Sequence, residues 1–223
     1  MPRTPRATTA DYVYHVLNRS TDRVPIFQKP GDFAWFESLM KKAHRRTPLR
    51  ILSYCLMPNH WHMVLWPRHD GQMPEFMSWL TGTHAQHWRI HRNTVGNGHV
   101  YQDRYKSFPI QDSTYFLTVC RYVERNALRA NLVDRAEKWI WSSLWRRENE
   151  NGLELLEDWP IRRPEKWIDW VNQPQTTAEL QALRACVQRN RPYGDPQWQE
   201  RTAKELGLES TLHPRGRPRQ IPA

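Results

Sequence analysis

Hydrophobic and polar positions alternate in several short stretches of this chain and recur at helical spacing in several longer ones. Alternation, with many β-branched and aromatic residues, predicts strands at 12–19, 49–57 and 60–66 and an extended, basic segment at 101–111. Apolar residues three or four positions apart predict helices at 29–46, 73–92 and 112–133. Pro58-Asn59 separates the second and third strands, which we therefore expect to form a tight hairpin.

The order strand–helix–strand–strand–helix–strand, with a closing helix, predicts the fold class. It is typical of an α+β protein with a ferredoxin-like antiparallel sheet. We expect the helices to cover one face of that sheet and to leave the other face free for a substrate. Residues 1–147 would form this domain. Residues 148–223 would form a helical, basic extension, which begins rich in tryptophan and acidic side chains and continues with helices at 176–190 and 195–208.

The charge balance narrows the class of partner. The 223 residues carry a formal net charge of +10, and arginine outnumbers lysine by more than three to one. Guanidinium groups pair with phosphates bidentately and stack on bases, so an arginine-rich and aromatic-rich chain favours a nucleic acid. The competing interpretation is that the arginine excess reflects only genomic composition.

Two other classes of protein are disfavoured. The three cysteines, Cys55, Cys120 and Cys186, are far apart and lack CxxC spacing, which argues against a disulfide framework or a cysteine zinc cluster. The chain contains no apolar run of about 18 residues, and its start lacks the apolar stretch of a signal peptide. We therefore expect a cytoplasmic protein with reduced thiols and no membrane partner.

Two histidines stand two positions apart in the third predicted strand, within MPNHWHMVLWP (57–67). Side chains at i and i+2 of a strand point to the same face, so His60 and His62 would project together while Trp61 packs on the opposite side. Adjacent imidazoles suggest a metal site. A chance pairing in a histidine-rich chain is the alternative interpretation.

The helix at 112–133 adds further candidates. Tyr122 and Asn126 are four residues apart and so share one helical face, opposite an apolar stripe. Three arginines lie beside them on the same side of this helix: Arg121, Arg125 and Arg129. The alternative interpretation, taking each residue alone, is structural. Tyr122 would be an amphipathic tyrosine at the boundary of the core, and Asn126 a solvent-facing amide.

In combination, these elements resemble the single-tyrosine HUH transposases, and most closely the REP-associated tyrosine transposases. Four segments carry the resemblance: MPNHWH (57–62), YQDRYKSFPIQ (101–111), TVCRYVERNALRANLV (118–133) and WSSL (141–144). The resemblance implies the HUH fold, with His60 and His62 as paired metal ligands, Tyr122 as nucleophile and Asn126 as third ligand. Related insertion-sequence enzymes carry a glutamine at that third position, so Asn126 favours the REP-associated subgroup.

The same resemblance implies the reaction and its partners. A divalent metal, Mg²⁺ or Mn²⁺, would polarise the scissile phosphate of single-stranded DNA, and the tyrosine would form a 5′-phosphotyrosine intermediate. The substrate would be a palindromic REP-type hairpin with single-stranded flanks, mobilised in DNA transposition. The protein would act in the cytoplasm, associated with the nucleoid, as a monomer or homodimer. The candidates for holding DNA phosphates are Arg104, Lys106, Arg121, Arg125 and Arg129.

The C-terminal tail offers a second mode of DNA contact. HPRGRPRQ (213–220) contains an AT-hook core, in which a flat, extended backbone lays arginines into a narrow minor groove. Arg215, Arg217 and Arg219 are the candidate contacts. A disordered basic end is the alternative interpretation. The pattern also leaves open whether the tryptophan-rich stretch 139–170 packs on the core or contacts DNA.

Two other functions share these features. A DNA-hairpin-binding regulator on the same scaffold would recognise DNA without cleaving it. A metal hydrolase would use the two histidines without a tyrosine nucleophile, and its product would carry no covalently attached protein.

Overall fold

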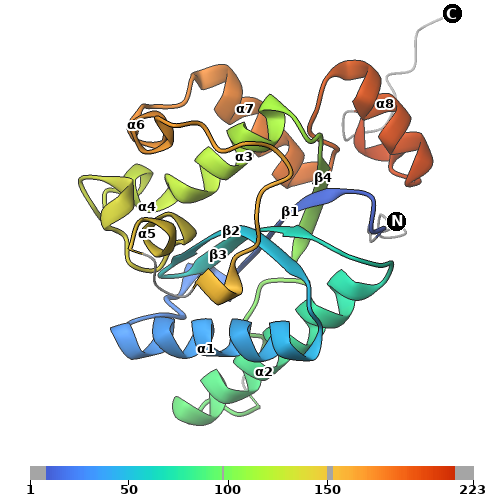
Figure 1. The fold of residues 1–223 in the computed structure, drawn as a ribbon. Helices are drawn as coiled ribbons and strands as arrows, with labels where there is room; N and C mark the ends of the chain where they lie inside the picture. Colours follow the sequence, from blue (N-terminus) through green and yellow to red (C-terminus); the bar gives the residue numbers. More distant parts are fainter. Residues whose placement is uncertain (1–8, 97, 150–152, 214–223) are drawn as a thin grey trace, which may run out of the picture.

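The centre of the molecule is a four-stranded antiparallel sheet (Figure 1). The computed structural model describes residues 9–96, 98–149 and 153–213. The strands are β1 (Val13–Arg19), β2 (Arg50–Met57), β3 (His60–Trp66) and β4 (Lys106–Ile110). Their order in the sheet is β2-β3-β1-β4, with every neighbouring pair antiparallel. This is the ferredoxin-like order, so the predicted α+β class is confirmed.

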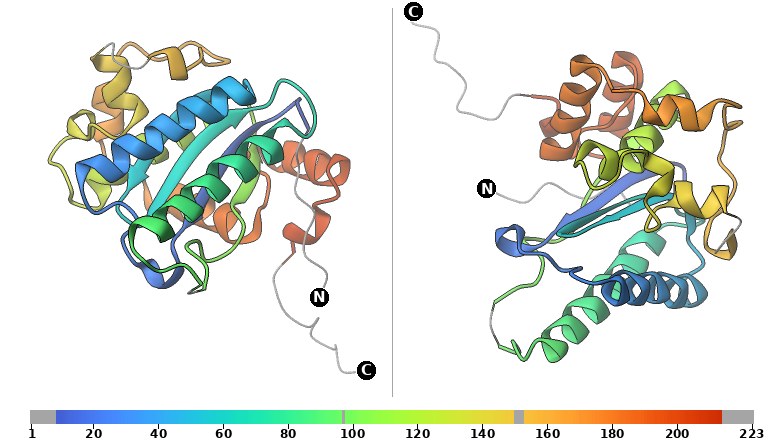
Figure 2. Two further views of the ribbon diagram at one scale, coloured as in Figure 1. Left: turned by 90° about the horizontal axis from the view of Figure 1, so that it is seen from below. Right: turned by 90° about the vertical axis from the view of Figure 1, so that its left-hand side faces the viewer.

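Helices cover both faces of the sheet, which corrects the expectation that one face stays free (Figures 1 and 2). On one face lie α1 (Pro30–Arg46) and α2 (Gln72–His91), packed against each other. The opposite face is covered by α3 (Thr114–Glu124), α4 (Asn126–Arg129), α5 (Ser143–Glu148), α6 (Trp167–Asn172) and α7 (Thr177–Arg189). α8 (Pro196–Glu205) follows, and the short 3₁₀ turns are η1 (Thr21–Arg23), η2 (Ala136–Lys138), η3 (Leu153–Leu155) and η4 (Glu209–Thr211).

The physical reason for two covered faces lies in the strands. Trp61, Met63 and Leu65 of β3 are fully buried against α1 and α2. Val64 of β3 and Phe108 of β4 are equally buried in a second core on the opposite face. Both faces are therefore apolar, and each needs a layer of helices to remove it from water.

The second core contains parts of the C-terminal extension. The apolar stripe of α3 packs there with Trp167, Leu183 and Tyr193, and Tyr193 forms an isolated bridge with Ile110 of β4. Within the tryptophan-rich stretch, Trp159 donates its indole N–H to the Leu52 carbonyl at 2.8 Å. The described residues of the extension thus complete the core of the first domain, and the boundary at residue 147 stays a prediction.

The predicted helix at 112–133 is two helices. Ser113 caps the first, with its side chain accepting from the Tyr115 backbone N–H. The regular helix is interrupted at Arg125, whose ψ of -2° departs from the α-helical value, and α4 follows. Asn131, with φ at 55°, follows α4 in the left-handed conformation. The predicted stretch 101–111 likewise contains a strand only at 106–110.

A buried carboxylate ties α3 to its neighbours. Glu124 is fully buried and accepts hydrogen bonds from Ser53 of β2 (3.2 Å), Ser143 of α5 (2.7 Å) and the Trp167 indole of α6 (2.7 Å). Three elements from distant parts of the chain therefore meet at one side chain. This network determines where α3 lies on the sheet.

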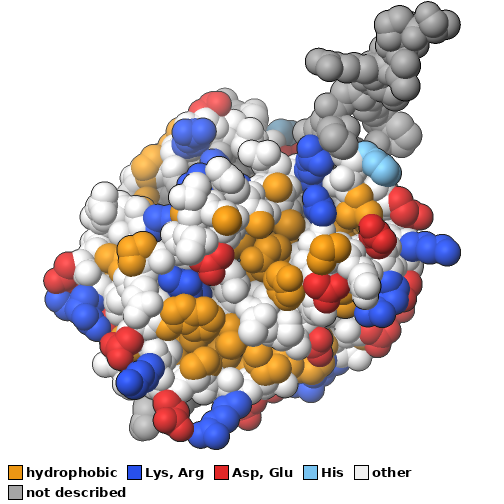
Figure 3. Space-filling model, turned by 90° about the horizontal axis from the view of Figure 1, so that it is seen from above, with side chains coloured by type: hydrophobic (Ala, Val, Ile, Leu, Met, Phe, Trp, Pro, Cys, Tyr) orange, Lys and Arg blue, Asp and Glu red, His pale blue; other side chains and the backbone are white. Residues whose placement is uncertain are grey.

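Figure 3 shows the face at the top of Figure 1. Hydrophobic side chains gather near its centre, and charged side chains lie mostly toward its margins. Among the described residues, no helix is long and apolar enough to cross a membrane.

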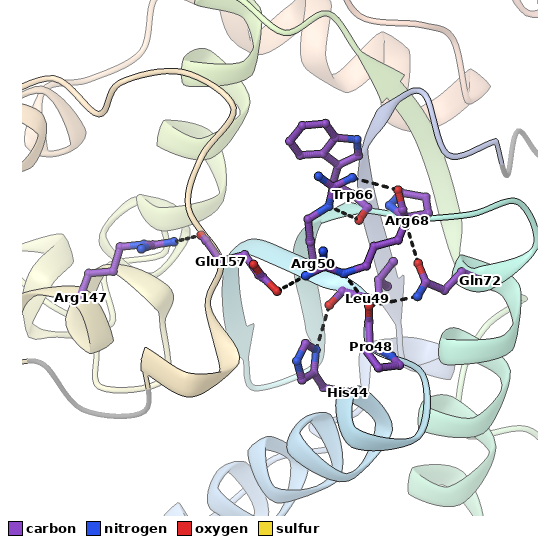
Figure 4. A network of polar contacts seen from close by, with 10 residues as sticks. His44, Pro48, Leu49, Arg50, Trp66, Arg68, Gln72, Arg147 and Glu157 are labelled. Carbon is purple, nitrogen blue, oxygen red and sulfur yellow. Dashed lines mark hydrogen bonds and ion pairs between the residues drawn. The ribbon is translucent and has the colours of Figure 1, made fainter.

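A second polar network joins the extension to the edge of the sheet (Figure 4). The Arg50 guanidinium stacks 3.4 Å from the Trp66 ring centroid and donates to the Trp66 carbonyl. Arg68 forms an ion pair with Glu157, whose carbonyl accepts from Arg147 at 2.8 Å. The segment after η3 is therefore held against β2.

Burial of His84 on α2 predicts an acid-sensitive fold. His84 is 2% exposed, its Nδ1 lies 2.8 Å from the Tyr101 hydroxyl, and burial lowers its pKa from 6.5 to about 3. Below pH 6.5 this histidine is protonated in the unfolded chain, whereas in the folded chain it stays neutral. The free energy of unfolding therefore decreases as the pH is lowered, by at most about 1.4 kcal/mol per pH unit for this group. His84→Asn keeps a hydrogen-bonding side chain and removes the contribution of His84 to the pH dependence of the free energy of unfolding. Urea unfolding at pH 7, 6 and 5 tests this, and equal slopes in the two proteins would contradict it.

Candidate active site

His60 and His62 project from β3 toward α3, on the face opposite Trp61, as strand alternation predicts. Their ring centroids are 5.1 Å apart. The Nδ1 of His60 lies 2.6 Å from the Asn59 side-chain oxygen in the hairpin turn, which orients that ring. Its Nε2 is therefore the nitrogen left for a ligand.

A third histidine, His15 of β1, belongs to this cluster and was missed by the sequence analysis. Its Nε2 lies 2.9 Å from the Nδ1 of His62, and the two rings are parallel to within 3°. His62 pairs with Leu17 of β1, and His15 lies two positions before Leu17 on the same face of the strand. His15 and His62 are therefore diagonal neighbours across the paired strands. A histidine at a buried, core-facing position of YVYHVLNR was the signal available in the sequence.

The three imidazoles are neutral at physiological pH. Burial lowers the pKa of His15 to about 3 and that of His60 to about 4, and the cation Arg129 acts in the same direction on both. Burial also lowers the pKa of His62 well below 6.5, with its two histidine neighbours adding to the effect. Neutral imidazole is the form that ligates metals.

The helical candidates meet these histidines. The Tyr122 ring packs edge-on against His62 at 5.7 Å and against His15 at 6.0 Å, between centroids. Arg129 lies over the Tyr122 ring, with its Cζ 4.2 Å from the ring centroid, and donates to the Asn126 side-chain oxygen at 2.6 Å. The fold therefore brings the predicted nucleophile, the two predicted histidine ligands and the predicted amide ligand into one cluster.

Unsatisfied polar atoms at this cluster support a ligand site. Within the described part of the chain, three buried nitrogens lack a hydrogen-bond partner there: His15 Nδ1, Asn126 Nδ2 and Arg129 Nη1. Buried polar atoms without partners are costly, so a polar cluster of this kind points to a further binding partner. Two imidazole nitrogens and an amide oxygen suit a divalent metal such as Mn²⁺ or Mg²⁺. No group of three His, Cys, Asp or Glu side chains forms an alternative metal site in the described residues.

The structure corrects the predicted role of Arg121. This side chain is 5% exposed, and its guanidinium donates to the carbonyls of Trp170, Gln173 and Pro174, each at 2.9 Å. Arg125 likewise donates to the Gln173 carbonyl at 2.9 Å. Arg121 therefore holds the end of α6 against the helix that carries Tyr122, and its donors are not available for a phosphate.

The remaining predicted DNA contacts lie in different places. Arg104 and Lys106 are exposed, and Arg104 lines a cavity of about 840 Å³ between α2 and residues 99–105. Arg19, which the sequence analysis also missed, is exposed on β1 directly opposite His60. The tail residues Arg215, Arg217 and Arg219 lie outside the described residues.

Removing the Arg121 side chain should destabilise the fold. Arg121→Ala leaves three carbonyls of the α6 end without their charged donor, and we expect a loss of about 2–4 kcal/mol in the free energy of unfolding. Arg184→Ala, at an exposed arginine of α7, is the matched control and should change it by less than about 0.5 kcal/mol. Urea unfolding of both variants measures this, and equal losses would contradict the structural role.

Comparison with known proteins identifies the family. The family model described as transposase, IS200-like, matches residues 8–126, and no curated protein matches the sequence significantly. Among solved structures, the chain is similar to a REP-associated tyrosine transposase bound to a REP hairpin. That likeness has 17% identity and a TM-score of 0.50, and covers 69% of this chain and 88% of the other. A putative transposase from Deinococcus radiodurans R1 is 16% identical with a TM-score of 0.38, and the match covers 56% of this chain and 95% of that one.

The likeness to the REP-associated enzyme, at 17% identity, is one of fold. The family match is one of sequence, and it contains His15, His60, His62, Tyr122 and Asn126. Because it covers more than half of the chain, this protein belongs to the family of IS200-like transposases and has the fold of a REP-associated tyrosine transposase.

Proposed function

We propose that the protein is a metal-dependent single-strand DNA transferase that cleaves beside REP-type hairpins through a 5′-phosphotyrosine intermediate. The observation that carries this proposal is the packing of Tyr122 against the His60–His62 pair within one chain. Because all these groups come from the same chain, a single copy is sufficient to build the site.

The proposed reaction is a transesterification. The Tyr122 phenol oxygen attacks the scissile phosphorus and forms a Tyr–O–P bond while the P–O3′ bond breaks. The phenol loses its proton, the departing 3′ oxygen gains one, and the number of phosphodiester bonds is unchanged. The reverse reaction with another 3′-hydroxyl joins strands without ATP.

The residues around Tyr122 supply positioning and charge. His60, His62 and the Asn126 oxygen would hold a divalent metal, which when bound polarises the phosphate and neutralises charge that develops on it. Arg129 lies over the Tyr122 ring and on the Asn126 oxygen. These two contacts hold the phenol ring and the amide in place for the attack.

The DNA partner is proposed from two observations. The similar solved structure is bound to a REP hairpin. In this chain, Arg19 lies opposite His60 on the neighbouring strand, where its guanidinium can pair with a phosphate next to the scissile one. Arg104 and Lys106 are candidates for the strand that leaves the site.

The first test follows the covalent intermediate. We expect a single-stranded oligonucleotide that contains a REP-type hairpin and its flanks, labelled at its 3′ end, to form a Mn²⁺-dependent adduct on a denaturing protein gel. Tyr122→Phe and His60→Ala should each lower adduct formation by about 10³-fold or more, because they remove the nucleophile or a metal ligand. The same oligonucleotide labelled at its 5′ end should release a free fragment with a 3′-hydroxyl.

Three results would contradict the proposal. An adduct that carries the 5′ label would reverse the polarity of cleavage. Cleaved DNA without an adduct would indicate a metal hydrolase. Tight hairpin binding without cleavage, with Mn²⁺ present, would indicate a regulator.

A second test concerns His15. For His62 to bind metal through Nε2, its proton must reside on Nδ1 and be donated to the Nε2 of His15, which selects one tautomer for each ring. His15→Leu removes the acceptor, and we expect Mn²⁺ affinity to fall about 10–100-fold. His15→Gln places an amide oxygen near the lost nitrogen and should retain most of the affinity.

Equilibrium Mn²⁺ titration, followed by electron paramagnetic resonance, measures this effect without DNA. His62→Ala provides the baseline for a lost ligand, and the midpoint of thermal unfolding without metal shows whether each variant is folded. Equal Mn²⁺ affinity in His15→Leu and the unmodified protein would contradict the positioning role.

A further inference from the structure

The last turns of α2 carry a second histidine pair, which the proposed reaction does not use. His87 and His91 are four residues apart and so lie on one helical face. Their Nε2 atoms are 3.0 Å apart, and their ring centroids 4.1 Å. α2 packs on the face of the sheet opposite α3, so this pair is separated by the sheet from the cluster around Tyr122 (Figure 1).

The spacing of these two nitrogens matches a shared metal ion. Transition metals bind imidazole nitrogen at about 2.0–2.1 Å. Two nitrogens 3.0 Å apart, each at that distance from one ion, subtend roughly 91–97° at it. This is the angle between neighbouring ligands in octahedral and square-planar coordination, which Ni²⁺ and Cu²⁺ favour.

Packing already holds one of the rings in place. Trp35 of α1 stacks on His87 with a centroid distance of 3.8 Å and an interplanar angle of 17°. The neighbouring Trp88 donates its indole N–H to the Ile26 carbonyl at 3.1 Å, which anchors this end of α2. A ring that is fixed before binding loses less conformational entropy when it takes a ligand.

The surroundings leave room for other ligands. His87 and His91 line a cavity of about 470 Å³ between α1 and α2, large enough for water molecules to complete a coordination shell. Asp32 lines the same cavity, but its carboxylate accepts the backbone N–H of Gln28 at 2.8 Å and pairs with Arg92. For an ion held here, the two imidazoles would be the protein ligands and water would supply the rest.

We propose that His87 and His91 form a second metal site, which is independent of the site at His60 and His62. It binds Ni²⁺ and Cu²⁺, and it binds Zn²⁺ more weakly because Zn²⁺ favours the wider tetrahedral angle. An imidazole pair without a carboxylate prefers these ions to Mg²⁺, and it binds Mn²⁺ most weakly of the first-row divalent ions. An ion at the second site would cross-link the last turn of α2.

Isothermal titration of the full-length, untagged protein with Ni²⁺ and with Zn²⁺, in buffer containing Mg²⁺, tests this proposal. We expect His91→Ala to lose one binding event or to weaken it at least tenfold, because one of two ligands that bind together is gone. His91 is exposed, so the substitution leaves the core intact. His69→Ala, at another exposed histidine, is the matched control and should bind like the unmodified protein.

A His62→Ala variant separates the two sites. It should keep the Ni²⁺ binding event that His91→Ala removes, whether or not the protein cleaves DNA. The proposal is overturned if His91→Ala binds Ni²⁺ and Zn²⁺ like the unmodified protein. It is also overturned if His69→Ala weakens binding equally, or if His62→Ala alone abolishes all binding.

Discussion

The position of the tyrosine helix depends on one buried carboxylate. Glu124 follows Tyr122 by two residues, and its two oxygens accept hydrogen bonds from β2, α5 and α6. A buried carboxylate is costly unless its oxygens are satisfied, so these donors and the helix must assemble together. Tyr122 can meet His62 only when α3 lies at this place on the sheet. The approach of Tyr122 to the histidines is thus a consequence of core assembly.

The cluster around Tyr122 combines neutral imidazoles with nearby cations. Burial and the positive charges of Arg19 and Arg129 keep His60 unprotonated. The same charges favour an anionic phosphate beside it, so one arrangement would suit both the proposed metal ligation and the proposed DNA contact. His15 connects this chemistry to the sheet, because its ring reaches His62 across the β1–β3 pairing.

The three arginines of α3, α4 and the residue between them have different roles. Arg121 and Arg125 bind carbonyls at the end of α6, whereas Arg129 contacts the tyrosine and the asparagine of the site. Their spacing along the helix is regular, and it does not distinguish a side chain that faces DNA from one that faces another segment. The extension completes the second core, and its carbonyls accept hydrogen bonds from Arg121 and Arg125. It is therefore part of the scaffold that holds the active-site helix.

The sequence by itself determined the features that depend on local periodicity. These are the order of strands and helices, the shared face of His60 and His62, and the apolar stripe of α3, because a period of two or 3.6 residues is readable along the chain. Only the tertiary structure decided which side chains meet across the sheet. The contact of His15 with His62, the burial of Arg121, the second layer of helices and the stacking of Trp35 on His87 each involve packing that periodicity does not specify. Such contacts follow from how apolar faces are covered, and that depends on the whole chain at once.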